Sequence, residues 1–198
     1  SGKEVTLSAD ECLFGYRDSI FKHSLHNKAV ITSVEYRLSK SYTPNISYKA
    51  FADTLQQQNI STPSAQQTAT IIEALRWSKL PHPEHLGNAG SFFKNPTINP
   101  KQYNHLKEKH PTMPAHAVEK GYKIPAAWLI EQSGLRDFVN GPCAVYENNP
   151  LVLVNLGGAT LTDINILSNI VIHEVNTRFD IFLEQEVVYQ PPTPFKNN

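Results

Sequence analysis

Residues 151–175 read LVLVNLGGATLTDINILSNIVIHEV, and this stretch decides the class of fold. Its first five residues form a continuous apolar run between a proline and two glycines, which is typical of a strand covered on both faces. Thr160 and Asp163 then cap a predicted helix whose apolar side chains recur at helical spacing up to Val175. A buried strand followed at once by an amphipathic helix predicts a sheet with a helix packed against it.

Outward from this stretch, the sequence predicts more helices and strands without a regular alternation of the two. Capping residues, a first-turn proline and a terminating glycine predict helices over residues 65–78, 100–109 and 126–130, and a short helix is expected near residues 48–55. Strands are predicted at residues 4–8, 28–38 and 179–189, and loops at 85–94 and 110–120. This order favours an α+β fold over a doubly wound sheet.

Composition limits the partners that the chain could have. The 198 residues are 40% apolar, and 18 basic residues balance 18 acidic ones, so no net field would attract nucleic acid or an anionic membrane. Cys12 and Cys143 lie far apart, which argues against a disulfide framework or a thiolate metal site. No apolar run matches a membrane span or a signal peptide, so we expect a cytoplasmic protein without a membrane partner.

The most unusual segment is Gly87-Asn-Ala-Gly-Ser-Phe-Phe-Lys-Asn-Pro96. Its glycines would let main-chain N–H groups approach a ligand, with the Ser91 hydroxyl directed forward. A tight turn anchored by its two phenylalanines explains the same pattern and is the commoner case. The nearby His82 and His85 are flanked by prolines and lack further ligands, so no metal site is predicted.

Two charged positions also suggest chemistry, each with a simpler alternative. Arg17 beside Asp18 could hold a carboxylate or phosphate through two hydrogen bonds, although a surface ion pair is more frequent. Glu184 and Glu186 would project from the same face of the last predicted strand, where a half-buried carboxyl group could carry a proton. A solvated strand face is the commoner explanation for two such glutamates.

Taken together, these motifs resemble the MurB family of UDP-N-acetylenolpyruvoylglucosamine reductases in their order and approximate spacing. The resemblance rests on residues 16–19, 79–81, 87–96 and 183–187, and the segment 87–96 is highly specific to the family. Residues 126–132 and 151–155 also look like family segments, so the resemblance covers essentially the whole chain. It implies that residues 1–66 are the C-terminal remnant of an FAD-binding domain, that 67–191 form the substrate-binding domain, and that 192–198 are a tail.

The resemblance implies an enzyme of bacterial peptidoglycan synthesis. This family uses NADPH to reduce bound FAD and then reduces UDP-N-acetylglucosamine enolpyruvate to UDP-N-acetylmuramate. By resemblance, Arg17 and Glu186 would stabilise the enolate-like intermediate, and Ser91 would deliver a proton to it. Gly90 and Ser91 would lie beside the flavin, whose pyrophosphate the family binds in a glycine-rich region that has no counterpart here.

The resemblance also implies the residues that bind the substrate. Tyr48, Lys79 and Asn95 match family positions that hold the UDP diphosphate, and Lys123 is a candidate near the uridine. Because Tyr48 lies in an extended 41–63 segment, the chain resembles the type I branch, in which this loop folds over the substrate.

The sequence departs from the family pattern at three positions. Gln185 stands where a proline is usual, Val188 where an arginine often follows, and Tyr146 where histidine is frequent. None of these departures removes Arg17, Ser91 or Glu186.

Three functions compete for this chain. In the first, the chain is one piece of an active reductase and is inactive by itself. The complete enzyme would be a monomer, whereas this piece would self-associate through its unpaired strands. The second is a non-catalytic UDP-sugar-binding module, and the third is a scaffold. Retention of Arg17, Ser91 and Glu186 favours the reductase, because binding of the diphosphate alone would not require them.

Overall fold

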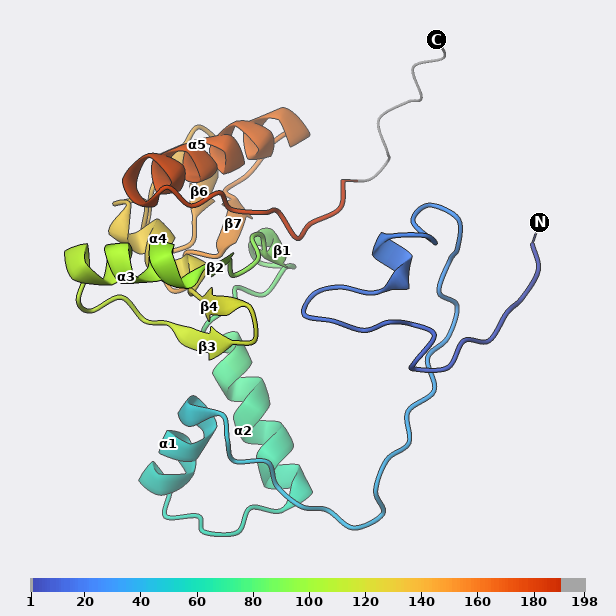
Figure 1. Ribbon diagram of the computed structural model, residues 1–198. Coiled ribbons are helices and arrows are strands. Elements are labelled where there is room, and N and C mark those ends of the chain that lie inside the picture. The colour runs from blue at the N-terminus through green and yellow to red at the C-terminus, as the bar shows by residue number, and fades with distance from the viewer. Residues whose placement is uncertain (1, 190–198) are drawn as a thin grey trace. The chain divides into compact units, whose positions relative to one another are not determined.

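The computed structural model describes residues 2–189, which divide between Thr43 and Pro44 into two compact units (Figure 1). Helices and antiparallel sheets occur together, which confirms the α+β class. Each unit has its own internal hydrogen bonds.

The N-terminal unit consists mainly of turns and irregular backbone, with a short 3-10 helix, η1 (Ile20–Lys22). Gly15 and Asp18 exchange two backbone hydrogen bonds of 2.9 and 3.3 Å, and Arg17 between them has a φ of +54°. The strands predicted at residues 4–8 and 28–38 are wrong, because both segments are irregular. A strand is stabilised by a paired neighbour and a covered face. Within residues 2–189, no ladder pairs with residues 28–38, whose side chains are exposed.

The helices of the second unit form where local sequence signals predict them. Ser64 and Gln67 make a reciprocal capping box, as do Thr160 and Asp163, while Asn99 caps the helix that begins with proline. The predictions for these helices are confirmed. The helices are α1 (Lys49–Gln57), α2 (Ala65–Trp77), α3 (Pro100–Lys109), α4 (Ala126–Gln132) and α5 (Leu161–Phe179).

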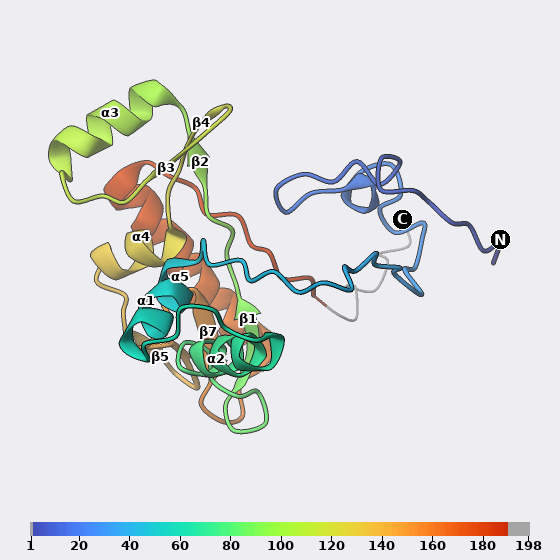
Figure 2. The same ribbon diagram turned by 90° about the horizontal axis from the view of Figure 1, so that it is seen from below.

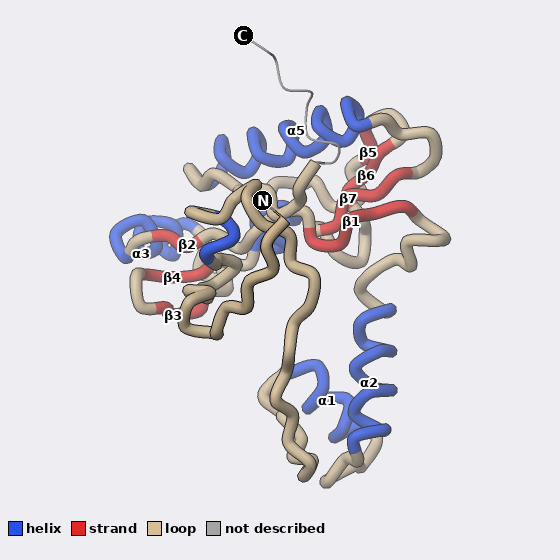
Figure 3. Tube along the Cα trace, turned by 90° about the vertical axis from the view of Figure 1, so that its right-hand side faces the viewer, coloured by secondary structure: helices blue, strands red, loops and turns tan. Residues whose placement is uncertain are grey.

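Two antiparallel sheets accompany these helices. The first has the order β1-β7-β6-β5, and the second has the order β2-β4-β3. The strands are β1 (Gly87–Ser91), β2 (Thr97–Ile98), β3 (His116–Val118), β4 (Gly121–Lys123), β5 (Val139–Asn140), β6 (Cys143–Val145) and β7 (Val152–Asn155). The buried strand expected at 151–155 is confirmed as β7, and α5 contacts β6 and β7 (Figure 3).

The loops predicted at residues 85–94 and 110–120 are corrected by the structure. Residues 87–91 form an edge strand because their backbone pairs with β7, placing Ser91 opposite Val152, with an irregularity between Asn88 and Ser91. The expected 110–120 loop contains β3, which pairs with β4. The glycine-rich pattern conceals β1 because its pairing partner, β7, is distant in sequence, whereas β3 pairs with the neighbouring β4 in a local hairpin.

The last described segment is extended but is not a ladder strand, which corrects the prediction for 179–189. Helix α5 continues to Phe179 and ends at Asp180 in a left-handed conformation with φ +53°. Beyond it, Gln185 forms an isolated antiparallel bridge to Phe93. The alternation expected from the sequence persists, since Ile181 and Leu183 are buried while the residue between them is exposed.

Candidate functional site

Three of the residues singled out from the sequence line one cavity of about 300 Å³: Tyr48, Lys79 and Ser91. Tyr48 is the N-cap residue of α1, Lys79 follows the C-terminal end of α2, and Ser91 ends β1 (Figure 2). The remaining lining residues are Ile72, Leu75, Arg76, Leu80 and Asn149.

The Tyr48–Lys79 contact joins the two ends of the α1–α2 hairpin. Lys79 Nζ donates a hydrogen bond of 2.9 Å to the Tyr48 hydroxyl and lies 5.4 Å from the centre of its ring. Arg76 lies one turn before Lys79 and contributes a second positive charge to the lining, which includes no carboxylate. Two cations beside a phenol hydroxyl suit a phosphate-bearing ligand.

The side chain of Asn88 holds β1 beside the segment that follows Lys79. Its Oδ1 accepts the Gly90 N–H at 2.9 Å, while its Nδ2 donates to the carbonyl oxygens of Pro81 at 3.1 Å and Leu86 at 2.8 Å. Gly90 has a φ of +72°, and no atom outside residues 89–91 lies within 4 Å of the position that a Cβ would occupy there. A side chain at Gly90 would be strained, and the bare backbone leaves room for a ligand.

Glu186 lies on the segment that pairs with the chain immediately after Ser91. Its N–H donates a 2.8 Å hydrogen bond to the carbonyl oxygen of Phe92, and its side chain is partly buried. The other glutamate of the motif, Glu184, forms an ion pair with Lys94. Glu184 thus contacts the continuation of β1, and Glu186 directly follows Gln185 of the Phe93–Gln185 bridge.

Asn95 and Lys123 lie outside the lining of this cavity. The Asn95 Oδ1 accepts the N–H of Ala126 at 2.8 Å and so holds the first turn of α4. Lys123 is in β4, opposite Thr97 on one side and His116 on the other.

Arg17 belongs to the N-terminal unit, where the surrounding turn fixes its backbone. Lys22 Nζ donates to the Arg17 carbonyl oxygen at 2.7 Å. Asp18 pairs with His23 at 2.8 Å, and this hydrogen bond holds the pKa of the Asp18 carboxyl group below its ordinary value of 3.8.

Sequence reasoning missed the two other polar lining residues, Arg76 and Asn149. Arg76 had a usable signal, because a residue three positions before Lys79 lies on the same side of a helix end. Asn149 lies in the turn before β7, and its place in the cavity depends on the pairing of β7 with β1.

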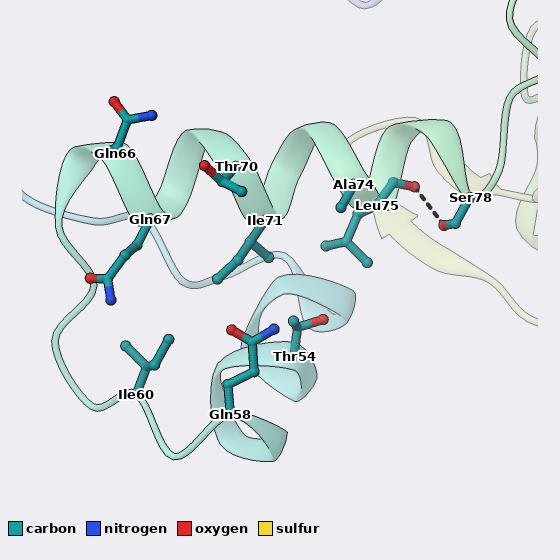
Figure 4. A pocket seen from close by; sticks show the side chains of 10 residues that line it. All are labelled: Thr54, Gln58, Ile60, Gln66, Gln67, Thr70, Ile71, Ala74, Leu75 and Ser78. Carbon is teal, nitrogen blue, oxygen red and sulfur yellow. Dashed lines mark hydrogen bonds between the residues drawn. The ribbon is translucent and has the colours of Figure 1, made fainter.

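A second hollow of about 420 Å³ lies between α1 and α2 (Figure 4). Its lining carries no charged side chain and none of the residues singled out from the sequence; it consists of Thr54, Gln58, Ile60, Gln66, Gln67, Thr70, Ile71, Ala74, Leu75 and Ser78. Leu75 lines both hollows.

Comparisons with known proteins agree with the resemblance of the motifs. Residues 82–190 match the model of the "UDP-N-acetylenolpyruvoylglucosamine reductase, C-terminal domain" family. The curated reductases of that name from Aliivibrio fischeri and Porphyromonas gingivalis are 44% identical over 182 residues and 39% identical over 190 residues. These matches cover 92% and 96% of this chain, but 51% and 56% of the relatives.

The chain thus spans about half the length of the curated relatives it matches. Among residues 2–189, no helix is long and apolar enough to cross a membrane.

Proposed function

The chain belongs to the family of UDP-N-acetylenolpyruvoylglucosamine reductases, and on this premise we propose that it binds the substrate in the reduction of UDP-N-acetylglucosamine enolpyruvate to UDP-N-acetylmuramate. This reaction would serve peptidoglycan synthesis in the bacterial cytoplasm. The observation that carries the proposal is the convergence of Tyr48, Lys79 and Ser91 on one cavity. Two of these residues suit a diphosphate, and the third suits a proton transfer.

The cationic end of the cavity would bind the UDP diphosphate. Lys79 would supply a compact positive charge, and the Tyr48 hydroxyl already lies 2.9 Å from its ammonium group. Charge-assisted hydrogen bonds of this kind are stronger than neutral ones, so the pair would contribute much of the affinity. Arg76 would add charge from the last turn of α2. Asn95 would contribute Nδ2 as a donor, and Lys123 would approach the uridine.

The residues at β1 fit the edge of a flavin. Gly90 has no side chain, and no atom outside residues 89–91 lies within 4 Å of where a Cβ would stand; Ser91, the next residue, lines the cavity. A planar ring could approach such a backbone closely. When bound, FAD would supply the hydride for the reduction, with NADPH as the source of electrons.

The remaining chemistry would fall to three side chains of this protein. Reduction at the terminal vinyl carbon leaves negative charge on the adjacent carbon and its carboxylate. Arg17 and Glu186 would stabilise that charge through preorganised hydrogen bonds. Ser91 would donate its hydroxyl proton to the adjacent carbon, which is basic enough to accept a proton from an alcohol held within hydrogen-bond reach.

A non-catalytic UDP-sugar-binding module is the second candidate. The Tyr48–Lys79 pair favours it, because these residues would bind a diphosphate without any contribution from Glu186 or Arg17. The two candidates differ in their need for Ser91.

The test compares the wild-type protein with Ser91→Ala in the full-length gene product. The intact mass and visible absorption spectrum are recorded with added FAD, and reoxidation of the reduced flavin by the UDP-sugar is then followed. If the chain is part of a reductase, the protein is yellow, and reoxidation of its reduced flavin is slower by about a hundredfold or more in Ser91→Ala. A colourless protein that binds the UDP-sugar identifies the module instead, and unchanged reoxidation in Ser91→Ala refutes the proton-donor role.

A further inference from the structure

Gln185 cross-links the last described segment to the core through its side-chain amide. Its Nε2 donates to Ser168 Oγ at 3.1 Å, and its Oε1 accepts from the Tyr189 hydroxyl at 2.9 Å. Ser168 lies on α5 and is the only fully buried polar or charged residue among residues 2–189. Since Ser168 Oγ also donates to the Asn165 carbonyl oxygen at 3.0 Å, the amide completes its hydrogen bonding.

The backbone N–H and C=O groups of Gln185 make neither of the two hydrogen bonds of its bridge to Phe93. The two hydrogen bonds of the bridge run from Lys94 N to Glu184 O and from Glu186 N to Phe92 O, both at 2.8 Å. Gln185 and Phe93 are thus a non-hydrogen-bonded pair of the antiparallel bridge, and the N–H of Gln185 makes no hydrogen bond to the Phe93 segment. A proline, which has no N–H, could stand at this position without breaking the bridge.

We propose that Gln185 is a positioning residue for Glu186. Its side-chain hydrogen bond to α5 restricts the segment in place of the backbone restriction that a proline would give. The proposal rests on the reductase function assigned above, in which Glu186 and Ser91 act on the same intermediate. Glu186 directly follows the tethered residue, and its N–H is bonded to Phe92, the neighbour of Ser91. Holding residue 185 therefore holds the glutamate and the serine in register.

The tether matters because the bridge is short. Two backbone hydrogen bonds join residues 184–186 to residues 92–94, and an isolated bridge of this length frays more easily than a ladder. The hydrogen bond to the buried Ser168 gives the segment a second attachment, to α5. Reaction rates are sensitive to displacements of about 1 Å in groups that must meet a reacting atom.

The test uses four single variants of the full-length gene product and the double variant Gln185→Ala with Ser168→Ala. Gln185→Ala removes both side-chain hydrogen bonds, Ser168→Ala removes the anchor, and Gln185→Pro restores a backbone restriction. Gln132→Ala is the matched control, because Gln132 is an exposed glutamine on α4. Turnover is measured together with hydrogen exchange of the Glu186 amide.

The proposal predicts that Gln185→Ala lowers kcat about tenfold while KM for the UDP-sugar changes less than about twofold. It also predicts faster exchange at Glu186 with unchanged exchange in β7, recovery of kcat in Gln185→Pro, and non-additive effects of Gln185→Ala and Ser168→Ala. Turnover of Gln185→Ala equal to that of Gln132→Ala overturns the proposal. Uniformly faster exchange throughout the protein, with no recovery in Gln185→Pro, also overturns it.

Failure of the reductase function gives a different result. A wild-type protein that does not reduce the UDP-sugar refutes the function, and with it any positioning for catalysis. Hydrogen exchange at Glu186 would still show whether Gln185 holds the segment.

Discussion

Replacing Asn88 with alanine removes the three hydrogen bonds that fasten β1 beside Pro81. These bonds join Asn88 to Pro81 O, Leu86 O and Gly90 N at 3.1, 2.8 and 2.9 Å. A neutral hydrogen bond contributes on the order of 1 kcal/mol, and water can replace part of that loss at this half-buried position. We therefore expect Asn88→Ala to lower the free energy of unfolding by about 2–3 kcal/mol. The corresponding fall in Tm is about 4–12 °C for a protein of this size.

Urea unfolding followed by tryptophan fluorescence measures this change. Trp128 is a suitable reporter because it packs against Phe179 of α5, with 5.6 Å between ring centroids. Asn104→Ala is the control, since Asn104 is exposed on α3 and its replacement should change stability by less than about 0.5 kcal/mol. A loss in Asn88→Ala no larger than that of the control would refute the reasoning that the Asn88 side chain fastens β1 beside Pro81.

Three further predictions concern charge, pH and association. Lys79→Ala should weaken binding of UDP about tenfold or more by calorimetry, because it removes a charge from the cavity, while the exposed Lys101→Ala should not. Hydrogen bonds from Thr160 hold the pKa of Asp163 below its ordinary value of 3.8. The ionised Asp163 carboxylate therefore stabilises the folded protein fully above pH 3.8, and this stabilisation is lost as the pH falls through the lowered pKa. Asp163→Asn should consequently show a smaller loss of Tm than the wild type on acidification from about pH 5 to pH 2, and an equal loss would contradict the linkage. The apolar side chains of Val30 and Leu38 are exposed, so we expect light scattering to show self-association that increases with protein concentration. The double variant Val30→Lys with Leu38→Lys should self-associate less. A wild-type protein that is monomeric at every concentration would contradict this prediction.

The helices were predictable because their signals are local. The capping boxes at Ser64 and Thr160 satisfy backbone groups within one turn, whatever surrounds them. The strands behaved differently, because a strand needs a partner that local sequence does not specify. Residues 28–38 have strand-forming side chains but no ladder among residues 2–189, whereas the glycine-rich 87–91 segment pairs with β7.

The candidate site shows the same division. Tyr48, Lys79 and Ser91 were identified from motifs, and the structure brings their side chains to one cavity. Their functional roles, like those of Arg17 and Glu186, stay predictions. Arg76 and Asn149 were found only as neighbours in that cavity.

By itself, the sequence determined the α+β class, the capped helices, the buried strand at 151–155 and the family motif at 87–96, because each depends on residues close together in the chain. Tertiary structure decided which segments pair, which side chains share a cavity, and that Gln185 reaches a buried serine on α5. These contacts join residues far apart in sequence, so they form only when burial of the common core offsets the loss of chain entropy.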